Sequence, residues 1–192
     1  MPNNIKIIKT EILSQKWSTL KEVTFKYLMK DGTWQTQTRE AFGRGNGAAI
    51  LLYNKEQKSI VLTRQFRLPS YINGNETGML IEACAGLLDN ENPEDCIERE
   101  TEEETGYRIN NAQKIFEVYM SPGGATEMLY FFIAEYSQQM KVHEGGGVSY
   151  EQENIEVLEM NIDDALKMIE TGEIRDAKTI MLLQYVRLKN IL

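Results

Sequence analysis

The sequence predicts a mixed fold of the α/β or α+β class, in which one domain of ordinary size carries a small extra β element. Up to residue 136, most segments show strand-like alternation and are separated by turn residues, with one helical segment among them. Two helical segments then close the chain. With 192 residues, 42% of them hydrophobic, the chain is long enough to bury a core.

The first 42 residues are predicted to form a separate antiparallel β module. Val23, Phe25 and Tyr27 alternate with polar residues, and the dipeptide Asp31-Gly32 is a hairpin signal. Two or three strands are too few to bury a face alone. We therefore expect residues 1–42 to pack on residues 43–192, which make the second predicted domain, or on a partner chain.

The second domain is predicted to hold a dense set of strands followed by two helices. The expected strands are 47–53, 59–67, 78–85, 113–120 and 127–136, with a last strand within 154–160. Asn161 is a candidate cap for a helix that ends at Gly172. A final helix is expected within 176–192.

One helix interrupts the strands, and its boundaries are marked on both sides. Asn92 is a good N-cap, and Pro93 stands at the first helical position, where its missing N–H costs nothing. Glu94 and Asp95 suit the positive end of the helix dipole. Gly106 is a suitable C-terminal stop.

Three carboxylates gather on one face of this helix. At 100° per residue, Glu100, Glu103 and Glu104 lie within about 100° of one another, one turn beyond Cys96 and Ile97. Each like-charged pair at this spacing costs roughly 0.2–0.5 kcal/mol. A hard divalent cation would offset this cost, since Mg²⁺ takes carboxylate ligands and substrate phosphates. From spacing alone, a solvated acidic helix explains the pattern equally well.

Composition excludes several classes of function. The net charge of −8 argues against a nucleic-acid surface. The two cysteines are too few for a disulfide framework, which favours a reduced, cytoplasmic location. No apolar run approaches the roughly 20 residues that span a membrane, so no membrane association is expected. His143 is the only histidine, which argues against a histidine triad or a multi-histidine metal site.

The segment RETEEETGY, residues 99–107, resembles the core of the Nudix box. The matching positions are Gly86, Arg99, Glu100, Glu103, Glu104 and Gly106, whereas Thr101 replaces an apolar residue. The span from Gly86 to Arg99 is one residue short, so Glu91 fits the spacing to Arg99 while Asn92 holds the place counted from Gly86. The segments SPGGATE and TGEIRDAKT extend the resemblance to the Nudix branch that cleaves nucleotide sugars.

This resemblance implies a fold, a reaction and an assembly. The fold is a Nudix α/β/α sandwich with a mixed sheet plus a small N-terminal antiparallel β module, and that module is exchanged across a homodimer. The reaction is Mg²⁺-dependent hydrolysis of GDP-mannose to GMP and mannose 1-phosphate, with Mn²⁺ as the alternative ion. ADP-ribose or another nucleotide sugar is the alternative substrate, and a non-catalytic nucleotide-sugar sensor is the rival class.

The resemblance also implies roles for individual residues. Metal ligands are the carbonyl of Ala85 and the carboxylates of Glu100, Glu104 and Glu153. Catalytic roles fall to Arg99, Glu103 and Glu153, with Glu151 as runner-up for the loop glutamate, and the Gly-rich segment before it is expected to be mobile. The implied substrate-binding residues are Trp17, Thr38, Arg39, Glu40, Arg67, Ala85, Gly86, Leu87, Glu104, Glu127, Gln152, Glu153 and Lys178. Ordinary packing remains the alternative for Trp17, and a surface position remains the alternative for Lys178.

Overall fold

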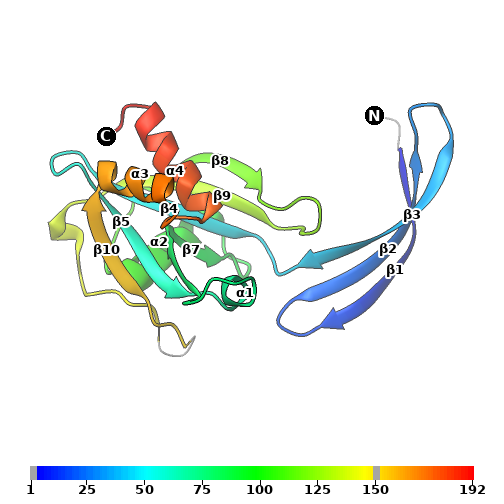
Figure 1. Cartoon of the computed structure of the whole chain (residues 1–192), viewed down its shortest axis with the longest axis horizontal. Coiled ribbons are helices and arrows are strands. Elements are labelled where there is room, and N and C mark those ends of the chain that lie inside the picture. Colours follow the sequence, from blue (N-terminus) through cyan, green and yellow to red (C-terminus); the bar gives the residue numbers. More distant parts are fainter. Residues whose placement is uncertain (1–3, 149–151) are drawn as a thin grey trace. The chain divides into compact units, whose positions relative to one another are not determined.

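The structure is a computed structural model that describes residues 4–148 and 152–192 (Figure 1). It separates into two compact units. One unit comprises Met1–Asn46 and Tyr119–Met128, and the other comprises Gly47–Val118 and Leu129–Leu192. The segment 119–128 belongs to the first unit because Phe42 donates its N–H to Gly124 O and accepts from Thr126 N. The division into domains 1–42 and 43–192, expected from the sequence, remains a prediction.

The N-terminal unit is built on a three-stranded antiparallel sheet. Its strands β1 (Ile5–Gln15), β2 (Thr19–Leu28) and β3 (Trp34–Gly43) follow one another in chain order. The predicted hairpin at Asp31-Gly32 is confirmed, with Gly32 at φ +84° and Asp31 accepting from the N–H of Thr33. No residue from 4 to 46 is buried. Three strands without a covering layer therefore have no core of their own.

A seven-stranded mixed sheet forms the second unit. Its strands are β4 (Gly47–Asn54), β5 (Ser59–Phe66), β6 (Met79–Glu82), β7 (Cys84–Leu87), β8 (Gln113–Tyr119), β9 (Met128–Glu135) and β10 (Glu156–Asn161). The order is β10-β5-β4-β9-β8, with β6 on β5 and β7 on β4. β4 pairs parallel with β9 and antiparallel with β5, so the sheet is mixed.

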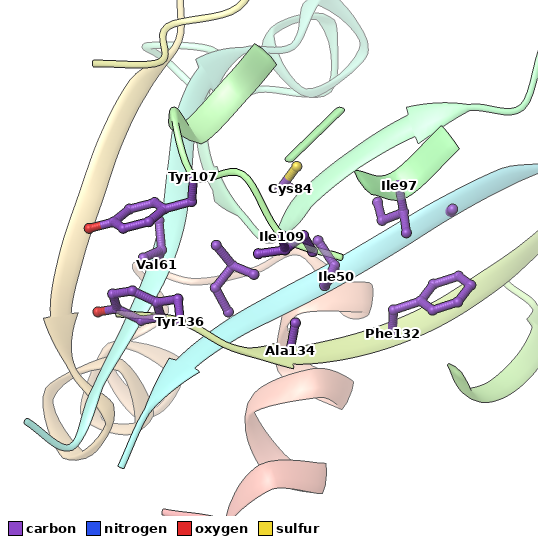
Figure 2. Close-up of a cluster of buried hydrophobic side chains, with 11 residues drawn as sticks. Ile50, Val61, Cys84, Ile97, Tyr107, Ile109, Phe132, Ala134 and Tyr136 are labelled. Atoms are coloured by element: carbon purple, nitrogen blue, oxygen red, sulfur yellow. The ribbon is translucent and has the colours of Figure 1, made fainter. Parts of the chain in front are cut away.

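Helices cover both faces of this sheet. α2 (Pro93–Thr105) contacts β4, β5 and β7, whereas α4 (Ala177–Leu188) contacts β4, and α3 (Ile162–Thr171) contacts β10 and α4. All eight residues of β4 are buried, as expected for a strand covered on both sides. Ile50 of β4, Ile97 of α2 and Phe132 of β9 share one buried cluster (Figure 2). The predicted α/β/α sandwich is confirmed.

Two details differ from the sequence prediction. The expected strand 78–85 is two short strands, because the chain leaves β5 after Glu82 and joins β4 at Cys84. Between them, Ala83 N donates to Thr179 Oγ1 at 2.6 Å in place of a strand partner. A five-residue helix, α1 (Leu68–Ile72), follows β5 and was not expected. No helix in the described part of the chain is long and apolar enough to cross a membrane.

Candidate active site

The acidic helix α2 forms as its boundary residues predict. Asn92 accepts the N–H of Asp95, Pro93 opens the helix, and Gly106 ends it at φ +79°. Thr101, in the place of an apolar residue, is fully buried and donates its hydroxyl to Ile97 O at 2.6 Å. A hydroxyl bonded to its own helix needs no other partner, so threonine is tolerated there.

Glu104 is a buried carboxylate on the inner side of α2. Its side chain is 1% exposed, and Oε2 accepts from Ala85 N at 3.4 Å. The pKa of Glu104 is raised to about 8, first by burial and then by the charges of Glu100 and Glu153, against the lowering effect of Cys84 and Arg67. Glu100 and Glu153 therefore each lie close enough to Glu104 to repel its charge.

Arg99 pairs with two carboxylates of α2 and with Glu91, which lies just before the helix. Its guanidinium pairs with Glu103 at 2.7 Å, Glu100 at 3.1 Å and Glu91 at 3.0 Å. Burial lowers the pKa of Arg99, but the hydrogen bond to Glu91 and the carboxylate charges outweigh burial and raise it. The structure thus gives Glu91 a partner in Arg99, although the spacing from Gly86 places Asn92 at that position of the box.

The strand β7 brings Ala85, Gly86 and Leu87 under the helix. A Cβ added to Gly86 would lie 2.2 Å from Cδ of Glu100, so only glycine leaves room for this carboxylate. Cys84, the first residue of β7, is buried, and its thiol interacts with Glu104. Burial raises the pKa of Cys84 well above its ordinary value, which makes this thiol a packing group.

The Gly-rich segment is bonded to the end of α2. Val142 N donates to Gly106 O at 2.8 Å, Gly146 N to Glu104 O at 2.8 Å and Gly147 N to Glu103 O at 3.0 Å. These bonds satisfy carbonyls that a helix end leaves unpaired. They hold residues 142–147 on the end of α2, and the mobility expected of the Gly-rich segment stays a prediction.

The loop glutamate Glu153 lies against the same segment. Its Oε2 accepts from Val148 N at 3.1 Å, and its charge acts on Glu104. Gln152 beside it is exposed at φ +58°. The runner-up, Glu151, lies outside the described residues.

Arg67 and Lys178 converge on a carboxylate that the sequence analysis missed. Glu82, at the end of β6, accepts from Arg67 Nε at 2.7 Å and from Lys178 Nζ at 2.8 Å. Lys178 is largely buried, so a surface position is excluded for it. A single acidic residue in the apolar run MLIEACAG was the available signal, because lone charges are rarely buried unpaired.

The other predicted substrate residues lie in the N-terminal unit. Trp17 is 88% exposed in the β1–β2 turn, so ordinary packing is excluded within the described residues. Thr38, Arg39 and Glu40 lie exposed on β3. Glu127 is paired with Arg44 at 3.0 Å. The structure thus divides the predicted site residues between its two units.

Two family models cover nearly the whole chain. One is described as the NUDIX domain and matches residues 43–183. The chain belongs to the Nudix family. The other, the GDP-mannose pyrophosphatase NudK N-terminal domain, matches residues 4–42.

Curated relatives are similar over the full length of both chains. The protein of Cronobacter sakazakii is 54% identical over 192 residues, covering 100% of each chain. Proteins of Shigella flexneri and Escherichia coli O157:H7 are each 53% identical over the same span. All three are named GDP-mannose pyrophosphatase. Together with the NUDIX match, these relatives identify the chain as a Nudix hydrolase.

The donor set of this Nudix site suits a hard divalent cation. Within residues 4–148 and 152–192, no three acidic, histidine or cysteine side chains converge as a ready-made metal site. Glu104 nevertheless accepts from the N–H of Ala85, and Glu100 lies against the neighbouring Gly86. Burial, followed by the charge of Glu100, raises the pKa of Glu104. Mg²⁺ is usually bound through one or two carboxylates together with substrate phosphates and water. The residues present therefore fit this ion.

Proposed function

We propose that this Nudix hydrolase cleaves the pyrophosphate bond of a nucleotide sugar, namely GDP-mannose, to give GMP and mannose 1-phosphate. The observation that carries the proposal is the crowding of Glu100 and Glu153 around the buried Glu104, with two basic residues on Glu82 nearby. Such a site suits a substrate that brings phosphate groups and a divalent ion together. The names of the full-length relatives support GDP-mannose as the sugar nucleotide.

Four groups would hold Mg²⁺, with Mn²⁺ as the alternative: the carbonyl of Ala85 and the carboxylates of Glu100, Glu104 and Glu153. A bound divalent ion neutralises phosphate oxygens and lowers the pKa of water. Glu153 accepts a proton from the attacking water, for which its position beside Glu104 is suitable. Glu103 orients this water, and Arg99 fixes Glu103 through the 2.7 Å ion pair.

Two groups of residues bind the substrate in this proposal. Arg67 and Lys178 bind phosphate, since a guanidinium fork suits phosphate oxygens. Gly86, Leu87 and Gln152 line the reacting end. Trp17, Thr38, Arg39, Glu40 and Glu127 contact the nucleotide.

A homodimer completes this site in our proposal. The N-terminal unit has no buried residue between positions 4 and 46, and its β1 exposes Ile5, Ile7, Ile8, Ile12 and Leu13. A second copy that covers these side chains would remove them from water. Two buried, unpaired cysteines support a cytoplasmic location for this dimer.

A substrate panel with product identification tests the function. GDP-mannose, GDP-glucose, ADP-ribose and NADH are each incubated with Mg²⁺, and the products are separated by chromatography. We expect GMP and mannose 1-phosphate from GDP-mannose at the highest kcat/KM, and no turnover in excess chelator. Preferred cleavage of ADP-ribose would replace the substrate assignment, and full turnover in chelator would exclude the metal site.

A further inference from the structure

Glu82 is a buried carboxylate that joins two basic side chains from distant parts of the chain. It is 4% exposed, and each of its oxygens accepts from one cation: Oε2 from Arg67 Nε at 2.7 Å and Oε1 from Lys178 Nζ at 2.8 Å. The two partners come from the end of β5 and from the first turn of α4. A carboxylate this buried is found almost only when it is paired.

The position of Lys178 is unfavourable for the helix that carries it. The second residue of α4 is at the positive end of the helix dipole, where a cation is disfavoured. Two carboxylates offset this: Glu82 at 2.8 Å and Asp176 at 3.0 Å. Asp176 is itself held as the helix cap, with its other oxygen accepting from Thr179 N and Oγ1. The ammonium is therefore fixed from two sides.

Arg67 keeps its outer nitrogens available. It binds Glu82 through Nε alone, and its Nη1 and Nη2 have no hydrogen-bond partner among the described residues. Its side chain is 39% exposed, against 5% for Glu82. The positive charge of Arg67 also lowers the pKa of Glu104, which places this cation next to the carboxylates of the site. An ammonium has three donors, so Lys178 likewise has one more than its two partners require.

We propose that Glu82 is a positioning residue that holds Arg67 and Lys178 together as one preorganised binding element for the diphosphate of the substrate. This inference rests on the proposed function, because it assigns a further residue to the same site. Glu82 is too buried to touch substrate, and it acts through its two partners. Planar guanidinium groups lose less freedom on binding phosphate when a fixed carboxylate already orients them.

The Glu82→Gln variant tests the proposal. The amide of glutamine keeps one acceptor oxygen for one of the two cations. Its NH₂ group is a donor and faces the donor of the other cation, so either Arg67 or Lys178 is released. We measure GDP binding by calorimetry with Mg²⁺, because GDP carries the diphosphate without the sugar. Removal of an outer-shell orienting group typically weakens affinity roughly 10–100-fold. We expect a loss of this size in GDP binding, with a matching rise in KM for the sugar nucleotide.

A double-mutant cycle with Arg67→Ala separates positioning from general destabilisation. If Glu82 acts through Arg67, the loss caused by E82Q shrinks by a factor of about 3 or more when Arg67 is already absent. Equal losses in both backgrounds, or normal GDP binding by folded E82Q, would overturn the proposal. Should E82Q not fold, the same cycle is run with Glu82→Asp, which keeps the charge but withdraws it by one methylene.

Glu159→Gln is the matched control. Glu159 accepts from Tyr107, Tyr136 and Gln138 and has no ion pair with any residue that the structure describes, so its loss affects stability without touching a cation. We expect E159Q to lower the melting temperature and leave GDP affinity unchanged; a loss equal to that of E82Q would overturn the inference. Turnover of GDP-mannose by the wild-type protein separately reports on the proposed function. If the double-mutant cycle shows coupling between Glu82 and Arg67 but the wild-type protein does not turn over GDP-mannose, the binding element is supported and the substrate assignment is refuted.

Discussion

Gly147 lies directly against the carboxylate of Glu153, because a Cβ on Gly147 would be 2.4 Å from Glu153 Oε2. Gly147 also donates its N–H to Glu103 O, while Gly146 donates to Glu104 O. The loop glutamate and the end of the acidic helix are therefore linked through three consecutive residues of backbone, 146–148, with Val148 N on Glu153 Oε2.

Gly147→Ala should reduce kcat strongly, whereas Gly146→Ala should not. Both glycines have positive φ, +81° and +106°, so alanine is strained at each. Only the methyl group on residue 147 meets Glu153, since the nearest atom to a Cβ on Gly146 is Ile155 O at 3.6 Å. We expect similar losses of thermal stability but a kcat loss confined to G147A, of roughly 10²-fold or more if Glu153 is the base.

Steady-state kinetics and thermal unfolding of the two variants check this. The kcat of Glu153→Gln shows how large a loss to expect when this carboxylate is removed. Glu151→Gln is the control for which of the two loop glutamates acts. Equal kcat in G146A and G147A would count against Glu153 as the proton acceptor. A larger loss in E151Q than in E153Q would move that role to Glu151.

Gly86→Ala should weaken the response to Mg²⁺ while the protein stays folded. The added methyl would lie 2.2 Å from the Glu100 carboxyl carbon, and a flexible side chain can move away where backbone could not. We expect a higher Mg²⁺ concentration for half-maximal activity, by a factor of about 10 to 100 for a disturbed ligand. In a Glu100→Gln background, G86A should add little, because its effect passes through Glu100. Additive losses would show that the methyl disturbs something else.

Glu104→Gln should stabilise the metal-free protein, increasingly as the pH rises. The pKa of Glu104 is about 8 in the fold against an ordinary value of 4.5, so the folded state favours the protonated form. Stability from this group is present below about pH 4.5 and is lost as the pH rises through 8. The loss is on the order of a few kcal/mol, at about 1.4 kcal/mol per unit of pKa.

Thermal unfolding in chelator between pH 5 and 8 measures this difference. The gap between E104Q and wild type should widen toward pH 8, and added Mg²⁺ should close it by stabilising the wild type. Parallel curves for the two proteins would mean that Glu104 is ionised without cost.

Glu104→Gln should also lose most of its kcat. The expected loss is roughly 10²–10⁴-fold, because the variant lacks the carboxylate charge of a metal ligand.

Mixed dimers test the role of the N-terminal unit. Deleting residues 1–42 should abolish both dimerisation and activity, as measured by light scattering and turnover.

If Arg39 acts in the partner's site, mixing Arg39→Ala with Glu104→Gln subunits places both lesions in one site and leaves the other whole. Up to about half of wild-type activity should then return. Inactive mixtures would confine Arg39 to its own chain and leave the hydrolase assignment intact.

The features that could be predicted from the sequence are those with local causes. Asn92, Pro93 and Gly106 mark the ends of α2 within a few residues, and the Asp31-Gly32 hairpin needs only its own turn. The break between β6 and β7 could not be found this way. It depends on Thr179, which is 96 residues from Ala83 in the sequence.

The site shows the same division. Spacing along one helix places Glu100, Glu103 and Glu104 together. The family resemblance implies substrate-binding roles for Arg67 and Lys178, but as separate residues. Their meeting on Glu82 requires β6 and α4 to be folded against each other. The bonds from residues 142–147 to α2 are equally non-local, and glycine content alone does not predict them.

The two buried cysteines can report when the site opens, because both lie where α2 packs on β7. Cys84 interacts with Glu104 beneath the helix and Cys96 lies on the helix itself, and burial raises the pKa of both thiols, that of Cys96 to about 12. An alkylating reagent reacts with thiolate, so neither sulfur is reactive while the fold is closed. The rate at which a maleimide labels them therefore counts how often α2 lifts from β7, without any engineered probe.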